Sequence, residues 1–442
     1  MLKADIIGRD EDRALGRHSG MNRDFRLFWA GETVSAFGSS FTQFAIPLLV
    51  FKLTGSAVYL AVTAALFTVP HLLFGLAIGA WTDRTERRRL MIVVDLLHAA
   101  TVASVPVAAA AGVLSVWWIL AAVFVASTLT IFFDATSFGA IPSLVEQADL
   151  VTANGRIQAS FAGASVLGPL VAGALLVVLP VERLLVVDAA TFLVSAVALS
   201  LIRRPFNAPL RPRSTSIRQD VVEGLRYVLA HPVLRNISAM MALVNLFSVI
   251  AFSQIVLLAK TRFAASDSEV GLLFAAGGLG VVVFGLLAGP LGRRLSFGDR
   301  ALGALMLNGL LMIALAFAPS LTLAIAIWGT ASGLATMFNI NTGSLRQSIV
   351  PNRMLGRIMT IAMVLAWSAQ PIGSIGGGIA IERTGNAQLV YAIVGAVMFL
   401  IPLYFRQFSP LGQAERYLGP AEDSLGPARR RDVAPAIPPS RR

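Results

Sequence analysis

Long runs of apolar residues dominate the chain, and short polar segments separate them. A helix needs about 20 apolar residues to cross the hydrocarbon core of a membrane. Six such runs contain no Asp, Glu, Lys or Arg, namely 57–81, 113–133, 157–181, 236–259, 270–292 and 358–381. Three contain one acid each (27–51, 90–112 and 184–202), and three more cover 301–319, 320–341 and 387–405. The runs lack the alternation of barrel strands, so the pattern predicts twelve transmembrane helices.

Composition agrees with a membrane protein. Hydrophobic residues make up 56% of the 442 positions and charged residues only 14%, and the mean hydropathy is +0.74, far above that of a soluble domain. The chain has no cysteine and four scattered histidines, so we expect no metal site and no cofactor. Motifs for ATP hydrolysis or common hydrolase chemistry are missing too, and the sequence does not indicate an enzyme.

The distribution of basic residues predicts the topology. With the N-terminus placed in the cytoplasm, 31 of the 36 lysines and arginines fall in cytoplasmic segments, as the positive-inside rule requires. Only Lys52, Arg183, Lys260, Arg262 and Arg383 face outward. We therefore expect both termini in the cytoplasm, and the Arg-rich, Lys-poor and Ala-rich composition indicates a GC-rich bacterial genome and hence an inner-membrane protein. The net charge of +12 then reflects topology and attraction to anionic lipid headgroups, and nucleic acid is not an expected partner.

The chain divides near its middle. A hydrophilic connector at 203–235 begins with a proline-rich stretch and continues with apolar residues at helical spacing from Ile217 to Leu229, which indicates an amphipathic helix on the membrane surface. The predicted organisation is a cytoplasmic tail (1–24), a six-helix bundle (25–202), this connector, a second bundle (236–405) and a disordered tail (406–442) rich in Pro, Gly and Arg.

The two halves resemble each other in sequence. Arg156 precedes Pro169 by 13 residues, and Arg357 precedes Pro371 by 14. Glycines surround both prolines. Spans five and eleven are therefore expected to be equivalent helices of a duplicated, pseudo-symmetric fold, and transporters place their substrate site between such repeats.

The loop after span two, Gly79 to Arg89, carries one aspartate and four arginines at the mouth of a membrane helix. Charges there are costly unless they have partners. The loop matches the G-x-x-x-D-R-x-x-R-R signature of the major facilitator superfamily at Gly79, Asp83, Arg84, Arg87 and Arg88. It departs from the signature at Glu86, where a second glycine is common.

The chain resembles the major facilitator superfamily over roughly residues 22–405. Span five is similar to the glycine-proline signature of exporters in that superfamily, with Gly163, Gly168, Pro169 and Gly173. The segments at 22–29 and 53–56 are similar to macrolide-efflux proteins and enterobactin-type siderophore exporters. The resemblance implies an all-α fold of twelve transmembrane helices in two pseudo-symmetric six-helix bundles.

The resemblance also implies a conformational latch. Asp83 would face the N-terminal end of span eleven near Arg357, where unpaired backbone N–H groups favour an anion, and Arg87 would reach Asp134 at the cytoplasmic end of span four. These contacts would hold the two halves together on the cytoplasmic side. The alternative is a solvated loop that only fixes topology.

Four titratable groups in the spans are candidates for proton coupling. Glu32, Asp95 and Asp188 lie five or six residues from span ends, within roughly 9 Å of the interface, and are expected to reach water. Glu32 is preferred because span one lines the cavity in this superfamily. His71, beside Pro70, is the deepest group and serves either as a relay or as a neutral partner of a freed carbonyl. Span four lacks the arginine common in proton-coupled relatives, so proton antiport rests on resemblance.

Five amide side chains in the second half are candidate substrate contacts, although interhelical hydrogen bonding is an equal account: Asn245, Gln254, Asn308, Asn339 and Asn341. The combined expectation is a monomeric secondary active transporter that exports an amphipathic small molecule, of drug or siderophore type, by alternating access with proton antiport. An uncoupled facilitator or uptake carrier, or a non-transporting membrane sensor, are the alternatives.

Overall fold

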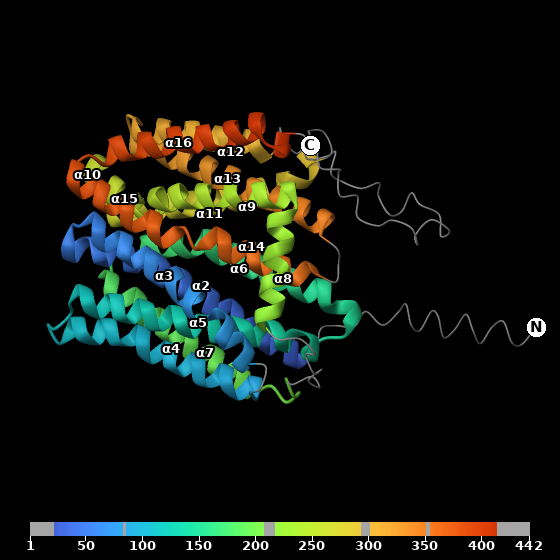
Figure 1. Ribbon diagram of the computed structural model, residues 1–442. Coiled ribbons are helices and arrows are strands. Elements are labelled where there is room, and N and C mark those ends of the chain that lie inside the picture. Colours follow the sequence, from blue (N-terminus) through green and yellow to red (C-terminus); the bar gives the residue numbers. More distant parts are fainter. Residues whose placement is uncertain (1–21, 83–84, 207–216, 293–300, 351–353, 413–442) are drawn as a thin grey trace, which may run out of the picture. The chain divides into compact units, whose positions relative to one another are not determined.

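The computed structural model describes residues 22–82, 85–206, 217–292, 301–350 and 354–412, and this part of the chain is helical without strands (Figure 1). Eleven helical stretches in it are long and apolar enough to cross a membrane, and one of these, Ile361–Thr384, contains a short interruption. The twelfth expected span, 301–319, is present as α12 (Gly303–Ala316), a helix of 14 residues. A single pass needs about 20 residues, so the prediction of twelve spans is confirmed for eleven of them.

The first compact unit contains the described residues up to Gly55, those from Val69 to 206, and Asp267–Gly271. Its helices are α2 (Arg23–Thr54), α4 (Arg87–Ala110), α5 (Val116–Leu144), α6 (Leu150–Leu175), α7 (Val181–Ser200), the later part of α3 (Ala57–Thr82), the first turn of α11 (Asp267–Gly292) and the short 3-10 helix η1 (Gln147–Asp149). Helix α2 packs on α7 and α6, and α4 packs on α7 and α5.

Local signals in the sequence explain where these helices begin and end. The side chain of Asn22 accepts a hydrogen bond from the Phe25 N–H at 2.8 Å and caps α2. Ser115 caps α5 in the same manner. Gly55 ends α2 in the left-handed region, with φ of 61°, a conformation that glycine adopts without the penalty of a Cβ atom.

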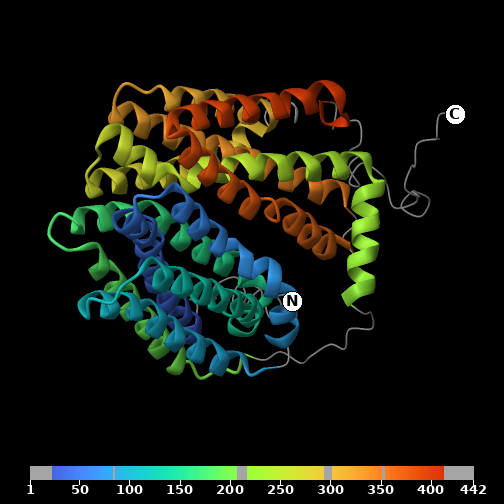
Figure 2. The same cartoon turned by 60° about the vertical axis from the view of Figure 1, so that its left-hand side comes forward.

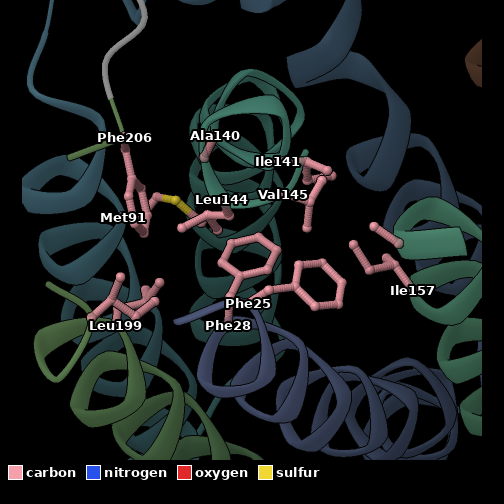
Figure 3. Close-up of a cluster of buried hydrophobic side chains, with 12 residues drawn as sticks. Phe25, Phe28, Met91, Ala140, Ile141, Leu144, Val145, Ile157, Leu199 and Phe206 are labelled. Atoms are coloured by element: carbon pink, nitrogen blue, oxygen red, sulfur yellow. The ribbon is translucent and has the colours of Figure 1, made fainter. Parts of the chain in front are cut away.

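A cluster of buried side chains holds one end of the first unit together (Figure 3). Phe25 and Phe28 of α2 lie at its centre, with Met91 of α4 and Leu144 of α5 beside them. The rings of Phe28 and Phe206 meet edge to face with centroids 6.3 Å apart. The start of α2 is thereby fixed against α4 and α5.

The second unit contains Ser56–Thr68 of α3, the residues from 217 to Ser266, and those from Leu272 onward. It comprises most of α11 together with α8 (Ile217–Ala230), α9 (Pro232–Ser253), α10 (Ile255–Phe263), α12, α13 (Leu321–Ile349), α14 (Leu355–Trp367), α15 (Gln370–Thr384) and α16 (Ala387–Phe408). Helix α12 packs on α16 and α13, and α9 packs on α15, α16 and α14.

Helix α8 occupies the region where the sequence indicates an amphipathic helix, and it runs across the direction of α9 in both views (Figures 1 and 2). Val228 on its apolar face is 1% exposed and packs with Met354 and Ile358. Val222 and Leu229 remain about half exposed. Part of the apolar face is therefore covered by protein, and the rest is free to contact lipid.

Two expected continuous spans are broken in the second unit. The run at 236–259 forms α9 and α10, which are separated at Gln254, and the run at 358–381 forms α14 and α15, which are separated at Ser368 and Ala369. Proline has no N–H to donate to a preceding turn, and Pro371 lies two residues after the second break, in the first turn of α15. Irregular backbone at membrane depth is tolerated where protein or a cavity surrounds it.

The internal repeat is visible in matching helices. Helices α5 and α13 each have 29 residues, begin after a capping serine (Ser115 and Ser320) and end before a valine (Val145 and Val350). Spans five and eleven, which we expected to be equivalent, differ in whether the helix is continuous. Helix α6 continues through Pro169, whereas its counterpart is broken before Pro371.

Candidate functional site

Besides Asp24 in the first turn of α2, three further carboxylates are buried in the first unit. Glu32 is 7% exposed, and Asp95 and Asp188 are each 1% exposed. We expected these acids to reach water because they lie near span ends, and this expectation is wrong for the structure. The reason is that α2 and α4 each pack closely on α7 and also contact α5, and these contacts bury the acids.

Hydrogen bonds to the three acids differ. Ser137 of α5 donates to Glu32 Oε1 at 2.9 Å. Thr42 of α2 donates to one oxygen of Asp188, and Thr191 donates to the other at 3.3 Å. Both oxygens of Asp95 are buried without a hydrogen-bond partner. A buried carboxyl group without partners is costly to keep, and such groups inside a membrane protein are candidates for function.

A buried histidine lies next to this acid in the sequence. His98 is 4% exposed and follows Asp95 by three residues on α4. Its Nε2 is 2.9 Å from the Ala126 carbonyl oxygen, and its ring stacks on Phe192 with centroids 4.5 Å apart. His71, the group expected to lie deep in its span, is in the middle of α3 and only partly buried within the protein. The i, i+3 spacing of Asp95 and His98 was the signal in the sequence.

The charged loop after α3 is built into the first unit through α4. The Glu86 carboxylate accepts a hydrogen bond from the Arg89 N–H at 2.9 Å and caps α4, which explains the departure from glycine at this position. Arg87 donates to the Gly139 carbonyl at 2.6 Å and to that of Phe206 at 3.3 Å. Arg88 donates to the carbonyls of Leu199 and Ser200.

The contacts of Arg88 satisfy a helix end. The last carbonyl groups of a helix have no partner within it, and Leu199 and Ser200 are the last two residues of α7. Arg88 therefore caps α7 from α4. Gly139 is a position where a side chain would interfere, because a Cβ atom there would lie 2.7 Å from Cζ of Arg87.

The expected latch is only partly within the described residues. Asp83 and Arg84 lie outside them, and of Arg357 only its place at the start of α14 is described. Gly79 lies in the last turn of α3 and accepts a hydrogen bond from Thr82. Asp134, which was expected at the cytoplasmic end of its span, lies within α5, and this helix continues ten residues further to Leu144.

The glycine-proline motif of α6 makes close helix contacts at two positions, and at the first a Cβ atom on Gly168 would collide with Oγ of Ser40 in α2. Gly168, Pro169 and Gly173 are buried, and a Cβ atom on Gly173 would lie 3.0 Å from Cα of Gly271 in the first turn of α11. A Cβ atom on Gly163 would meet no atom within 4 Å. Gly173 is therefore required by packing, whereas Gly163 is not.

A cavity of about 280 Å³ lies within the second unit, between α9, α12, α13, α15 and α16. Three of the five candidate substrate contacts line it: Asn245, Asn308 and Asn339. Gln370, which the sequence reasoning did not select, also lines it, and its position next to Pro371 at the helix break was the available signal. Its Nε2 lies 3.4 Å from Asn245 Oδ1, and Thr68 donates to its Oε1 at 3.2 Å.

The other two candidates lie outside this cavity. Gln254 is fully buried and donates to the Ala57 carbonyl at 2.9 Å. Asn341 is 7% exposed and donates to the Met337 carbonyl of its own helix at 2.8 Å. Hydrogen bonding within the protein accounts for the amide N–H groups of both side chains, whereas Oε1 of Gln254 is buried without a partner.

The cavity wall carries no ionisable side chain. Its described lining consists of apolar residues, methionines, Phe252, Phe338 and Trp328, together with amides and the hydroxyls of Ser248 and Ser332. Among the described residues, no group of three His, Asp or Glu side chains could hold a metal ion. The wall is suited to an apolar ring with hydrogen-bonding groups.

The protein is a helical membrane protein with buried acids in one unit and an amide-lined cavity in the other. This combination is typical of a membrane transporter. Solved structures agree with this fold. The chain is similar to a bacterial homologue of the human lysosomal transporter Spinster, with a TM-score of 0.70 and 15% identity over 91% of this chain and 98% of that one. It is also similar to a bacterial homologue of the iron transporter ferroportin, with a TM-score of 0.69 and 18% identity over 87% of this chain and 98% of that one.

The chain belongs to the major facilitator family described as transmembrane secretion effector, which matches residues 20–423. It is 30% identical to the multidrug efflux pump Tap of Mycolicibacterium fortuitum over 85% of this chain and 95% of that protein. It is 25% identical to macrolide efflux protein A of Streptococcus pyogenes over 82% of this chain and 90% of that protein. It is therefore a multi-pass transporter of the efflux branch and not an enzyme.

Proposed function

We propose that this protein exports an amphipathic small molecule from the cytoplasm by alternating access between the bundles at 25–202 and 236–405, and that protons entering the cell drive the export. The protein works as a monomer with both termini in the cytoplasm. The proposed cargo is of drug or siderophore type. The printed names of its relatives, a multidrug pump and a macrolide efflux protein, support this class of cargo.

The observation that carries the proton-coupling proposal is the set of buried acids in the first unit. Glu32, Asp95 and Asp188 are at most 7% exposed, and none of them forms an ion pair within the described part of the chain. A membrane protein retains such costly groups where they carry protons or ions. Glu32 remains the preferred carrier, with Ser137 as its hydrogen-bond donor.

An uncoupled carrier is the second candidate. Helix α5 contains no arginine or lysine from Val116 to Leu144, whereas many proton-coupled relatives have an arginine in the corresponding span. A transporter that lacks this residue could equilibrate its substrate without a gradient. The two candidates differ in one observable quantity, the proton flux that accompanies the substrate.

Proton release from liposomes distinguishes the candidates. Purified protein is reconstituted with a pH dye inside and challenged with macrolides, lipophilic dyes, and catechol or hydroxamate siderophores. A proton flux that depends on substrate supports antiport and identifies the cargo class at the same time. Substrate movement without proton flux rejects antiport and favours the uncoupled carrier. Absence of any flux favours a membrane protein without transport activity.

The latch is part of the proposal. Asp83 and Arg357 are proposed to hold the cytoplasmic side closed, with Arg87 and Asp134 as the supporting pair. Charge reversal at Asp83 is expected to increase the accessibility of cysteine probes on the cytoplasmic side. Equal accessibility from both sides before and after the change would reject the latch.

A further inference from the structure

We infer that the cavity within the second unit is a binding subsite for an uncharged ring compound that carries at least one N–H or O–H donor. This inference rests on the proposed export function and deepens it by naming the chemistry of the part of the substrate that is held here. Four observations support it: the size of the cavity, its aromatic wall, an unpartnered acceptor, and the absence of charge.

Size limits the occupant. The cavity has a volume of about 280 Å³, near the lower end of the range of about 300–1,000 Å³ for small-molecule sites. One or two fused rings fill such a space, whereas a macrolide with its sugars exceeds it. A large substrate would place only one ring system or side group in this subsite.

The aromatic wall suits a flat ring. Phe252 and Trp328 stack with their centroids 6.4 Å apart and their planes at 28°, and both line the cavity. Met312 and Met398 line it as well, and the flexible thioether of methionine adapts to rings of different shape. These side chains recognise an aromatic or alicyclic ring by contact area.

Asn308 is the reason why the ligand needs a hydrogen-bond donor. Its side chain is 3% exposed, its Nδ2 donates to the Ala331 carbonyl at 2.6 Å, and its Oδ1 is buried without a partner. The group left over is thus an acceptor, and leaving it unpaired is costly. A ligand with an N–H or O–H group pairs it after a small side-chain adjustment.

Charge is excluded by the wall. Every described lining residue is uncharged at any physiological pH, so an ionised ligand would lose its hydration without gaining a counter-charge. Contact with Trp328 alone offsets only part of that loss. The subsite therefore selects uncharged molecules over ions of the same shape.

The internal repeat supports this assignment. Asn339 is the nineteenth residue after the capping Ser320 of α13, and Asp134 is the nineteenth after Ser115 of α5. Met241 is the tenth residue after His231, and Glu32 is the tenth after Asn22. Both Met241 and Asn339 line the cavity. The second unit thus has neutral side chains at two positions where the first unit has acids.

Three indoles test the inference on the purified full-length protein. Indole is uncharged and has an N–H donor, 1-methylindole lacks the donor, and tryptamine carries a positive charge. We expect saturable binding of tritiated indole, at least tenfold weaker competition by 1-methylindole, and no competition by tryptamine. Equal competition by all three, or no saturable indole binding, would overturn the inference.

Variants locate the binding. Asn308→Leu is expected to abolish the preference for indole over 1-methylindole, and Asn339→Asp is expected to admit tryptamine. Asn341→Leu, two residues from Asn339 on the same helix and outside the cavity, is the matched control and should keep the wild-type preference. If both cavity variants bind the three compounds as wild type does, the inference is wrong.

The proposed function is assessed separately. Export from liposomes that persists unchanged in Asn308→Leu and Asn339→Asp, for every substrate that is carried, overturns the subsite and leaves the exporter standing. Binding with the predicted selectivity but without export of any compound supports the subsite and rejects the exporter.

Discussion

The ammonium group of Lys52, in the last turn of α2, forms an ion pair with the carboxylate of Asp267, the first residue of α11. Their side chains are 41% and 21% exposed, so the pair contributes only about 0.2–1 kcal/mol. The pair is relevant to conformational change, because it joins the end of the first helix of one sequence half to a helix of the other half. Lys52 is also one of the five basic residues that we place on the outer side.

Crosslinking this pair tests whether the contact opens during transport. The chain has no cysteine, so Lys52→Cys with Asp267→Cys provides the only two thiols. A short, reducible thiol-specific crosslinker is expected to lower efflux at least tenfold, and reductant should restore it. The single-cysteine variants treated alike are the controls. Full efflux in the crosslinked protein would mean that this contact persists through the whole cycle.

Replacement of Glu32 by glutamine tests the proton carrier. Glutamine keeps the shape and can still accept the hydrogen bond of Ser137, so Glu32→Gln is expected to fold normally. It should lose more than 90% of gradient-driven efflux while still exchanging substrate across the membrane. Ser137→Ala, which removes only the donor, should retain transport with a shifted pH profile. An unchanged pH dependence in Glu32→Gln would rule out this carboxylate as the carrier.

Neighbouring arginines offer a test of helix capping. Arg88 donates to the last two carbonyls of α7, and hydrogen bonds from charged donors contribute about 1.5–3 kcal/mol. Arg88→Ala is expected to lower the thermal unfolding midpoint in detergent. The side chain of Arg89 is exposed, and Arg89→Ala should leave the midpoint within 1–2 °C of wild type, about the scatter of surface substitutions. Equal losses in the two variants would contradict the capping role.

Glycines of α6 give a second matched pair. A Cβ atom on Gly173 approaches the backbone of Gly271, so Gly173→Ala should cost about 1–3 kcal/mol through overpacking. Gly163 has open space around it, and Gly163→Ala should be neutral or stabilising by up to about 1 kcal/mol because alanine favours the helix. Chemical unfolding in mixed micelles measures both. A loss in Gly163→Ala as large as that in Gly173→Ala would show that glycine is needed for flexibility.

The pH dependence of stability should include a contribution from His231. Burial lowers the pKa of His231 below its usual value of 6.5, and its Nδ1 accepts a hydrogen bond from the Leu234 N–H as the N-cap of α9. The neutral form is therefore favoured by folding. This contribution is complete above pH 6.5 and is lost as the pH falls through the lowered pKa.

Thermal unfolding between pH 5 and 8, the range in which histidine ordinarily titrates, measures this effect. The wild-type midpoint is expected to fall by about 2 °C more than that of His231→Asn, since asparagine caps a helix without titrating. Parallel pH profiles of the two proteins would exclude His231 as the source.

Much of the fold follows from the lengths of the apolar runs, because a membrane leaves few alternatives to a helix of about 20 residues. The breaks at Gln254 and before Pro371 were not predicted, since glutamine and proline both occur inside continuous membrane helices. Pro169 is an example of the latter in this chain. Whether a helix breaks depends on partners far away in sequence, such as Ala57 for Gln254.

The sequence was enough to select most candidate residues by their type, but it did not predict their burial or their contacts. Acids stand out in an apolar sequence, and Glu32, Asp95 and Asp188 were selected, whereas the buried Asp24 was not. The burial of the selected acids was underestimated because depth along a helix says nothing about neighbouring helices. His98 was missed although it lies one turn from Asp95. The capping of α7 by Arg88 requires that two distant segments meet, and no local pattern indicates it.

The uncharged cavity wall determines whether the membrane voltage contributes to the driving force for export. If an uncharged molecule leaves for each proton that enters, every cycle carries one positive charge inward, and the membrane voltage drives export together with the pH difference. A voltage of 100 mV acting on one charge corresponds to about 2.3 kcal/mol, enough for a concentration ratio of about 50. A cell could then keep exporting at neutral external pH, where the pH difference is small, by drawing on voltage alone.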